Sequence, residues 1–382
     1  MQQFDFQPST RVVFGENSID QVGVLAKELN ARRVLLVTDP GLIRAGHVER
    51  ALYSLKKESI DALVFSGVEE NPTTTHVENG VRFAGENKPI DLIAGLGGGT
   101  AMDCAKGINF LLTNGGTMED YWGMGKATKP MLPSMGIPTT AGTGSEAQSY
   151  ALIAKADTHE KMACGDLKAR FRTVILDPTL LTSVPRKVAA ITGIDAISHA
   201  IESYVCTRRN PLSQMFAKEA WRLLEKNFEL VLRQPENIEA QGEMLLGANL
   251  AGAAIENSML GAAHACANPL TARYNITHGV AVGLMLPHVI KFNSEVVNGH
   301  YNDLLAVVGI SSSKKNTSGE ILADKINQLK TAAGFPRSLR ELQVEALALP
   351  VLANAASKQW TGTFNPRPIH ESDFLQLYET AF

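Results

Sequence analysis

The chain has 382 residues, of which 45% are hydrophobic and 20% charged, with a formal net charge of −3. This composition allows a large core and two domains, and the lack of a basic block argues against nucleic acid as a partner. The first residues show no signal-peptide pattern, and we expect no transmembrane helix and no membrane partner. The four scattered cysteines indicate reduced thiols, so we expect a cytoplasmic protein.

In the first half, short apolar runs alternate with helix-like segments. We expect strands at 11–15, 33–38, 62–65, 90–96 and 173–178, and helices at 48–58 and 74–87. Ser18, with Gln21 three residues further on, is typical of a helix N-cap. Strands that alternate with helices predict a parallel sheet covered on both faces.

The pattern changes at Pro185. Beyond it the strand-like runs thin out and helical periodicity dominates, which predicts helices at 212–232, 238–258 and 318–333. The sequence therefore predicts an α/β domain over residues 1–184 and an all-helical domain over residues 185–382.

Two segments of the first half are rich in glycine and hydroxyl side chains. Residues 97–100, Gly-Gly-Gly-Thr, follow a strand and begin a helix, whose free N–H groups and dipole favour an anion such as a pyrophosphate. Residues 138–146, Pro-Thr-Thr-Ala-Gly-Thr-Gly-Ser-Glu, could form a second wall of a nucleotide site. Each is also typical of an ordinary loop. The Gly-x-Gly-x-x-Gly fingerprint and the Walker A motif are both missing from the sequence.

Four side chains of the second half could hold a metal ion. Asp195 and His199 are four residues apart in a helical segment, so both side chains lie on one face. His264 and His278 follow in apolar surroundings, and a carboxylate with three imidazoles can bind one divalent ion. The spacing alone is more often that of a surface pair, but polar residues are rarely buried without a partner.

These motifs occur together in a known family. The chain resembles the iron-containing, or group III, alcohol dehydrogenases over essentially its whole length. The resemblance is carried by residues 14–15, 38–39, 97–103, 138–146, 161–162, 177–178, 195–202, 264, 278–279 and 365–368. The segments 138–146 and 195–202 are specific when they occur together.

The resemblance implies a dehydroquinate-synthase-like architecture, in which an α/β nucleotide-binding domain precedes a helical domain. It implies one divalent metal, usually Fe²⁺ and in some members Zn²⁺, held by Asp195, His199, His264 and His278. It implies that NAD is contacted by Asp39, Asn71, Gly97, Gly98, Gly99, Thr100, Thr139, Thr140, Thr143, Lys161 and Leu181. The expected reaction is hydride transfer between NAD(H) and a small or medium alcohol, or its aldehyde or ketone, with the substrate bound to the metal and no side chain assigned as acid or base.

Two positions depart from the family pattern. Thr100 replaces a common serine and keeps the hydroxyl. Asn268 stands where many relatives carry a second histidine, and an amide cannot shuttle a proton near neutral pH. The main alternative is an NAD-using lyase of the dehydroquinate-synthase type, although no cluster of Lys, Arg and His for a phosphate-bearing substrate is evident near 264–278. A metal-dependent hydrolase would leave the glycine loop unexplained, and a non-catalytic binding protein would explain neither feature.

We also expect a homo-oligomer, a dimer or larger. The early strand at 11–14 would have a free edge that could pair with its copy across a two-fold axis.

Overall fold

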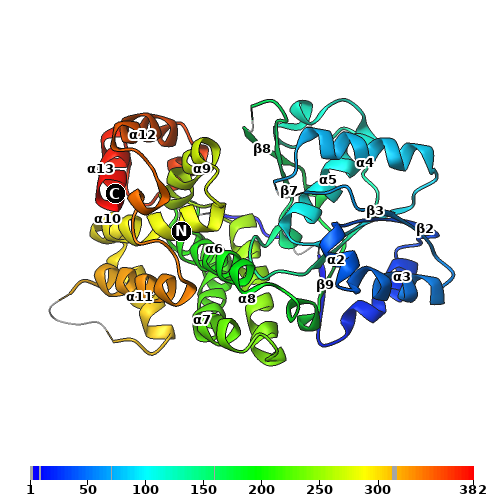
Figure 1. Ribbon diagram of the computed structural model, residues 1–382, viewed down its shortest axis with the longest axis horizontal. Coiled ribbons are helices and arrows are strands. Elements are labelled where there is room, and N and C mark those ends of the chain that lie inside the picture. Colours follow the sequence, from blue (N-terminus) through cyan, green and yellow to red (C-terminus); the bar gives the residue numbers. More distant parts are fainter. Residues whose placement is uncertain (1–2, 8–9, 70, 159, 312–315) are drawn as a thin grey trace. The chain divides into compact units, whose positions relative to one another are not determined.

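The structure is a computed structural model that describes residues 3–7, 10–69, 71–158, 160–311 and 316–382. The chain forms two compact units. The α/β unit consists of Gln7–Thr140 and Gly144–Val184, and the helical unit consists of Met1–Phe6, Ala141–Thr143 and Pro185–Phe382. Figure 1 shows the strands within the first unit and the long helices within the second.

A six-stranded sheet in the order β1-β9-β6-β4-β2-β3 forms the centre of the α/β unit. Its strands are β1 (Arg11–Phe14), β2 (Arg33–Val37), β3 (Asp61–Phe65), β4 (Leu92–Gly97), β6 (Ser134–Pro138) and β9 (Thr173–Leu176). All neighbouring pairs are parallel. The inner strands are buried almost throughout, and β4 is buried at every position. Burial on both faces explains why these strands are continuous apolar runs in the sequence.

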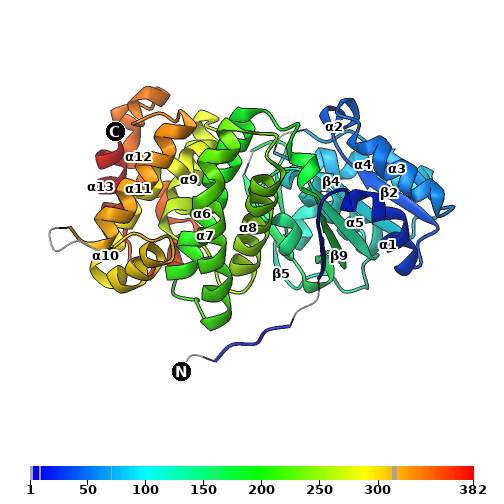
Figure 2. The same ribbon diagram turned by 90° about the horizontal axis from the view of Figure 1, so that it is seen from below.

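Helices cover both faces of this sheet. They are α1 (Val22–Glu28), α2 (Pro40–Arg44), α3 (His47–Lys57), α4 (Thr74–Glu86) and α5 (Gly99–Asn114). Helix α1 packs on α3, and α4 packs on α5. These two pairs lie on opposite faces of the sheet, as Figure 1 shows; Figure 2 shows the same helices from below. The expected α/β fold of the first half is therefore confirmed.

A small second sheet was not predicted from the sequence. It has the order β5-β8-β7, with β5 (Gly123–Met124), β7 (Tyr150–Ala154) and β8 (Lys161–Gly165). Strands β7 and β8 pair antiparallel. Their segments are short, and β5 lies far from β8 in the sequence, so local periodicity does not reveal the sheet.

The expected N-cap at Ser18 is wrong. Asn17 is the N-cap residue, with a left-handed φ of 59°, and Ser18 is the first residue of a 3₁₀ helix, Ser18–Gln21. The buried carboxylate of Asp177 accepts from the N–H groups of Asn17 at 3.0 Å and Ile19 at 3.1 Å. An acceptor about 160 residues away in the chain thus takes the place of the local hydroxyl that was expected.

The helical unit confirms the predicted helical second half. Its helices are α6 (Arg186–Val205), α7 (Pro211–Arg233), α8 (Ile238–Glu256), α9 (Ala262–Tyr274), α10 (His278–Val307), α11 (Ser318–Ala333), α12 (Leu349–Ser357) and α13 (Glu371–Ala381). Helix α6 packs against α7, α8 and α10, and is buried over most of its length. This surrounded helix is the one that carries the Asp195–His199 pair.

Two glycines of α10 allow it to approach α6 closely. A Cβ atom at Gly279 would lie 2.4 Å from the carbonyl oxygen of Ile191, and one at Gly283 would lie 2.6 Å from the Ile194 side chain. Real Cβ atoms cannot come so close, so only glycine permits this contact. The contact brings His278, the first residue of α10, next to the middle of α6.

The expectation that no apolar run reaches the length of a transmembrane helix is wrong for α10. This 30-residue helix contains a window with a mean hydropathy of 1.3. Of that window, 67% is buried inside the protein. Length and composition therefore match a membrane span, whereas the burial is that of the core helix of a globular unit.

All four cysteines are buried and form no disulfide among the residues that the structure describes. Cys104 and Cys164 belong to the α/β unit, and Cys206 and Cys266 to the helical unit. Burial raises the pKa of Cys104 and of Cys164 to about 12.

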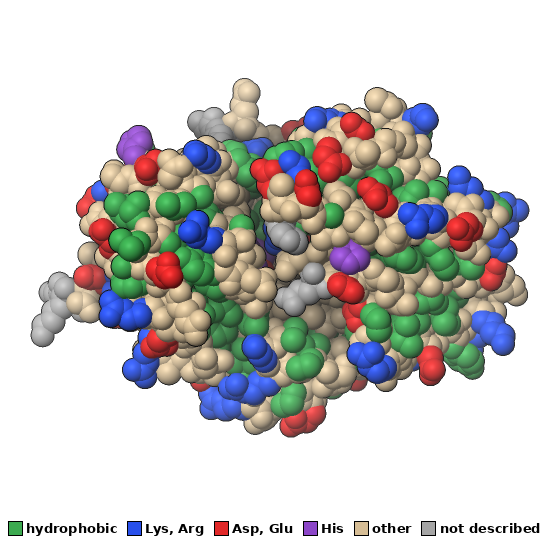
Figure 3. Space-filling model, turned by 45° about the horizontal axis from the view of Figure 1, so that its top comes forward, with side chains coloured by type: hydrophobic (Ala, Val, Ile, Leu, Met, Phe, Trp, Pro, Cys, Tyr) green, Lys and Arg blue, Asp and Glu red, His purple; other side chains and the backbone are tan. Residues whose placement is uncertain are grey.

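On the surface, Figure 3 shows acidic and basic side chains interspersed over the visible face.

Candidate metal centre and nucleotide loop

Asp195 and His199 lie one turn apart on α6 and are each only 6% exposed. The His199 Nε2 atom lies 3.6 Å from Asp195 Oδ1. A carboxylate and an imidazole four residues apart on a helix face the same way, as the sequence predicted. The buried face of α6 thus presents one oxygen and one nitrogen to the same point.

His264 and His278 complete this group from two other helices. His264, in the first turn of α9, places Nε2 3.6 Å from Asp195 Oδ1. His278, at the start of α10, places Nε2 4.0 Å from the same oxygen. The rings of His199 and His264 stack at 4.9 Å, and those of His264 and His278 lie 5.4 Å apart. The structure therefore brings together all four residues that the sequence singled out.

The arrangement fits a divalent metal ion. Two ligand atoms bound about 2.1 Å from one ion at a tetrahedral angle lie about 3.4 Å apart. The ligand atoms of Asp195, His199 and His264 all lie within 4.8 Å of one another. Within the described part of the chain, Asp195 Oδ1 and His264 Nε2 are buried without a hydrogen-bond partner. Their separation of 3.6 Å is too long for a hydrogen bond, so a cation between them would satisfy both atoms.

Crowding in this cluster shifts its pKa values. Burial would raise the pKa of Asp195, but His199, His264 and His278 outweigh it and hold that pKa well below its usual range. Burial lowers the pKa of His199 by more than Asp195 raises it. Burial also opposes the charge of His264, yet Glu202 and Asp195 raise its pKa to about 9. An ionised carboxylate beside crowded imidazoles is the electrostatic setting that a bound cation stabilises.

One residue of this region was missed by the sequence reasoning. The Glu202 side chain, 3% exposed, accepts hydrogen bonds from Nδ1 of His264 and from the backbone N–H of Ala263. A signal was present in the sequence, because Glu202 lies seven residues after Asp195, two turns along the same buried helix. A carboxylate on such an apolar helix has to have a partner.

The glycine loop lies at the carboxyl end of adjacent strands of the main sheet. Gly97 ends β4 and Gly98 is the N-cap of α5, where no side chain caps the helix. Asp39 follows the neighbouring strand β2, and a Cβ atom on Gly97 would lie 3.7 Å from its Oδ2. Thr139 follows β6 and donates its N–H to the Gly97 carbonyl at 3.0 Å, while Thr140 borders Gly98.

This edge is the usual ligand site of a doubly wound sheet. The chain continues from β2 to β3 on one side and from β4 to β6 on the other, so β2 and β4 flank the point where the strand order reverses. Ligands of such sheets bind outside the carboxyl ends of the strands at that point. The structure thus gathers Asp39, Gly97, Gly98, Thr139 and Thr140 in one place.

The remaining expected nucleotide contacts are distributed over other elements. Gly99 and Thr100 form the first turn of α5. Asn71, with a left-handed φ of 57°, lies in the segment between β3 and α4. Lys161 begins β8, and Leu181 is buried at the end of the 3₁₀ helix Pro178–Leu181. Thr143 belongs to the helical unit.

A buried lysine supports the hydroxyl-rich loop, and the sequence reasoning did not identify it. Lys106 on α5 is 1% exposed, and its Nζ donates to the carbonyl oxygens of Ser145, Gln148 and Tyr150 at 2.7 to 2.8 Å. Three such bonds satisfy all three donors of the ammonium group. The helix that begins with the glycine loop therefore also fixes the chain that follows Thr143.

Asn268, the departure from the family pattern, lies one turn after His264 on α9. Its Nδ2 donates to Oε1 of Gln359 at 2.9 Å. The amide is therefore oriented by a neighbour from the C-terminal segment.

In this chain a parallel α/β unit with a glycine loop at a helix start is joined to a helical unit with a buried carboxylate and three imidazoles. This combination is typical of metal-dependent, nucleotide-linked enzymes, a class that includes oxidoreductases. The family model described as "Iron-containing alcohol dehydrogenase" matches residues 9–178, and the model "Fe-containing alcohol dehydrogenase family, C-terminal" matches residues 189–382. The chain belongs to the iron-containing alcohol dehydrogenase family.

Individual relatives agree over the full length. The chain is 33% identical to a 1,3-propanediol dehydrogenase of Citrobacter freundii over 99% of both chains. It is 30% identical to an NAD-dependent methanol dehydrogenase of Bacillus methanolicus over 100% of both. It is similar to a solved alcohol dehydrogenase of Oenococcus oeni with a TM-score of 0.95 and 29% identity over 100% of both chains. The protein is thus an alcohol/aldehyde oxidoreductase, and the lyase alternative is disfavoured.

Proposed function

We propose that Asp195, His199, His264 and His278 hold one divalent metal ion, Fe²⁺ or Zn²⁺, at which an alcohol and its aldehyde or ketone are interconverted. The observation that carries this proposal is the convergence of three imidazole Nε2 atoms on Asp195 Oδ1, at 3.6 to 4.0 Å. Imidazole suits both ions, and Zn²⁺ binds such ligands more tightly than Fe²⁺ does. The isolated protein can therefore hold zinc even where iron is used in the cell.

The proposed redox partner is NAD(H). The uncapped start of α5 offers free N–H groups to a pyrophosphate, and Asp39 on the adjacent strand offers a carboxylate to ribose hydroxyls. The B. methanolicus relative is named as NAD-dependent. The full proposed set is Asp39, Asn71, Gly97, Gly98, Gly99, Thr100, Thr139, Thr140, Thr143, Lys161 and Leu181. Residues 1–184 would thus bind the dinucleotide, and residues 185–382 would carry the metal.

When bound, the metal would supply Lewis acidity to the substrate oxygen and the nicotinamide would accept or deliver the hydride. The side chains of the protein would position the metal and the substrate and limit the access of water to them. Asp195, His199 and His264 are only 4 to 6% exposed, so they exclude water from one side of the cluster. The side chain of His278 is 25% exposed, so solvent reaches the cluster at this residue. Asn268 can orient a substrate but cannot carry its proton.

Small alcohols and aldehydes are the proposed substrates. Relatives are named for 1,3-propanediol, methanol and lactaldehyde.

We also propose a cytoplasmic homodimer. Strand β1 pairs only with β9 among the described strands and leaves its other edge free, with Val12 and Phe14 45% and 49% exposed. Such an edge favours pairing with a second copy. Light scattering at micromolar concentration that gives the mass of a monomer would reject the dimer.

The central test combines metal analysis with NADH absorbance on a panel of short alcohols and aldehydes. The wild type should contain about one metal ion per chain and turn over at least one member of the panel. His278→Ala should lose most of the metal and nearly all turnover. His300→Ala, on the same helix α10, is the matched control and should retain both. Full turnover by metal-depleted His278→Ala would reject the proposal.

A further inference from the structure

The helix that carries His264 is capped by side chains from elsewhere in the fold. Gly261, the N-cap of α9, offers no side chain to the free N–H groups at the helix start. Oδ1 of Asn365 accepts from the N–H of Ala262 at 3.3 Å, and Oε1 of Glu202 accepts from the N–H of Ala263 at 2.7 Å. The first turn of α9 is thus held by α6 on one side and by the C-terminal segment on the other.

Glu202 holds the ring of His264 with its other oxygen. Oε2 accepts a hydrogen bond from Nδ1 of His264. Metal binding requires the neutral ring, and a single proton held on Nδ1 leaves the Nε2 lone pair, 3.6 Å from Asp195 Oδ1, available to the ion. One carboxylate therefore fixes the backbone before His264, the orientation of its ring and its tautomer. Metal-binding histidines usually depend on such a partner.

Gly261 leaves the space that both acceptors need. A Cβ atom there would lie 3.0 Å from Glu202 Oε1 and 3.2 Å from Asn365 Oδ1. Those distances are closer than ordinary van der Waals contact. A larger residue would therefore push the two oxygens away from the N–H groups they satisfy. Glycine at this position is explained by the capping arrangement and not by a turn.

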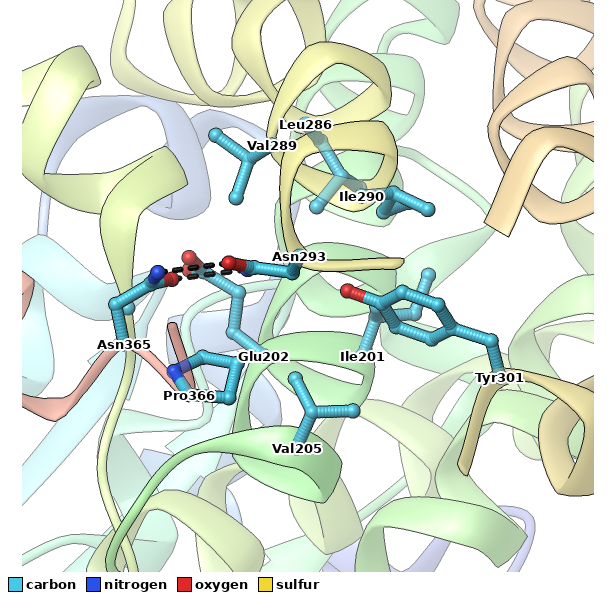
Figure 4. A pocket seen from close by; sticks show the side chains of 11 residues that line it. Ile201, Glu202, Val205, Leu286, Val289, Ile290, Asn293, Tyr301, Asn365 and Pro366 are labelled. Carbon is cyan, nitrogen blue, oxygen red and sulfur yellow. Dashed lines mark hydrogen bonds between the residues drawn. The ribbon is translucent and has the colours of Figure 1, made fainter. Parts of the chain in front are cut away.

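Asn365 is itself fixed by a paired amide. Asn293 Nδ2 donates to Asn365 Oδ1 at 2.9 Å, and Asn365 Nδ2 donates back to Asn293 Oδ1 at 2.7 Å (Figure 4). Asn365 Nδ2 also donates to the carbonyl of Arg367 at 2.7 Å. These contacts give a role to Asn365 within the Asn365-Pro366-Arg367-Pro368 motif, for which the sequence suggested none.

The paired amides border a small cavity that is otherwise mostly apolar. Its volume is about 10 Å³, room for one water molecule at most. Its apolar lining comes mainly from α6 and α10, and Glu202 and Tyr301 also border it. The apolar residues are Ile201, Val205, Leu286, Val289, Ile290 and Pro366. Hydrogen bonds between such deeply buried groups are strong, and losing one partner there is costly. The whole assembly is therefore rigid support behind His264.

We infer that Glu202 and Asn365 are positioning residues that hold His264 in the orientation and tautomer needed to bind the metal. The inference rests on the proposed function, since it requires His264 to be a metal ligand. Neither residue needs to touch the metal, the substrate or the nucleotide. Loss of such a supporting partner typically weakens metal binding about 10-fold to 100-fold.

Glu202→Gln is the decisive variant because the two side chains have nearly the same shape. Both oxygens of Glu202 accept from donors, Ala263 N–H and His264 Nδ1–H. A glutamine amide has one oxygen and one NH₂ group, so its oxygen can accept from only one of these two donors. Its NH₂ group then faces the other donor and cannot accept from it. It either leaves the helix uncapped or favours the His264 tautomer whose proton blocks Nε2. We expect Co²⁺ to bind about 10-fold to 100-fold more weakly.

Asn365→Ala is the second variant, and Asn210→Ala is its matched control. Asn210 is also a buried asparagine cap, and its Oδ1 accepts from Leu212 and Ser213 at the start of α7. Loss of either cap should lower stability by a similar amount. Only the loss of Asn365 should weaken Co²⁺ binding, because α7 carries none of the four proposed ligands.

The measurement is Co²⁺ titration of the metal-free full chain, with the visible absorption spectrum of the cobalt-loaded protein as a report on the ligand set. We expect wild type and Asn210→Ala to share one Kd and one spectrum, and Glu202→Gln and Asn365→Ala to differ in both. If folded Glu202→Gln has the Kd and the spectrum of the wild type, the inference is overturned. If Glu202→Gln does not fold, the same result in Asn365→Ala overturns it. A wild type that binds Co²⁺ no better than His264→Ala would instead overturn the metal site itself.

Discussion

At the scale of single residues, the carboxylate of Asp39 has one oxygen engaged and one facing the glycine loop. Oδ1 accepts from the N–H groups of Gly41 at 2.7 Å and Leu42 at 3.2 Å, which caps α2. Oδ2 lies on the side of Gly97. The carboxylate can therefore cap its helix and meet a ribose at the same time.

Asp39→Asn should shift cofactor preference towards NADPH. Asparagine is an equally good helix cap, so α2 is kept while the charge is removed. Two like charges about 4 Å apart at an effective dielectric of about 20 repel by on the order of 4 kcal/mol, before screening by salt. A third of this is roughly a tenfold change in the ratio of kcat/KM for NADPH to that for NADH. The same ratio in Asp39→Asn, Asp39→Gly and wild type would leave Asp39 as a capping residue only.

Lys330 on α11 should weaken the fold at neutral pH. The residue is 5% exposed, and its Nζ donates to Asn327 Oδ1 at 3.3 Å. Burial lowers its pKa to about 8, below the value of about 10.4 for an unfolded chain. The folded state therefore binds the proton less tightly, and the charge destabilises it below pH 8 by an amount that fades between about pH 8 and about pH 10.4.

Lys330→Met should therefore raise the free energy of unfolding at pH 7 by on the order of 3 kcal/mol, and the gain should vanish near pH 10.5. Urea unfolding at both pH values measures this difference. Lys358→Met, at an exposed position, should change little at either pH. A gain of equal size at pH 7 and pH 10.5 would mean that packing, and not the charge, is responsible.

Single residues also show what sequence reasoning can and cannot find. Asp195 and His199 were identifiable because four residues on a helix is a local relation. Glu202 and His264 are 62 residues apart, and Asn365 is a further 101 beyond His264. No periodicity links them, so their roles emerge only once the helices are packed. His278 was identified, but the glycine contact that places it was not.

At the scale of elements, the closeness of α10 to α6 depends on Gly279. Gly279→Ala would place Cβ 2.4 Å from the Ile191 carbonyl and should force the two helices apart. We expect a loss of about 1–3 kcal/mol in stability and weaker metal binding, because His278 moves with α10. Gly299→Ala, in the same helix, meets nothing within 4 Å and should be neutral or stabilise by up to about 1 kcal/mol. Denaturation with metal titration of both variants checks this, and equal behaviour would refute the close-contact argument.

Elements differed in how well the sequence predicted them. The buried strands β2, β4 and β9 and the helices α7, α8 and α11 were expected close to their observed bounds, because long apolar runs and regular periodicity are strong signals. The β7–β8 pair was missed because its strands are rich in residues that are uncommon in strands: β7 contains two alanines, and β8 contains a lysine, an alanine and a glycine. The acceptor for the Ile19 N–H is the side chain of Asp177, and such distant hydrogen bonds leave no local mark in the sequence.

At the scale of the whole molecule, the metal ion and the dinucleotide should stabilise different units. All four proposed metal ligands lie in the helical unit, whereas the glycine loop lies in the α/β unit. Zn²⁺ at about 1,000 times its Kd should stabilise the state that binds it by about 4 kcal/mol. Hydrogen exchange should therefore slow mainly in α6 and α9 with Zn²⁺, and mainly at 97–106 with NADH. Protection by Zn²⁺ confined to 97–106 would contradict the assignment.

The burial of the cysteines gives the protein a built-in reporter. Each unit contains two thiols, Cys104 and Cys164 in one and Cys206 and Cys266 in the other, and all four are buried. Buried thiols are inert until the surrounding structure opens. A pulse of an alkylating reagent followed by mass spectrometry would therefore label each unit only when that unit opens, so the stability of the two halves can be followed separately in one unmodified chain.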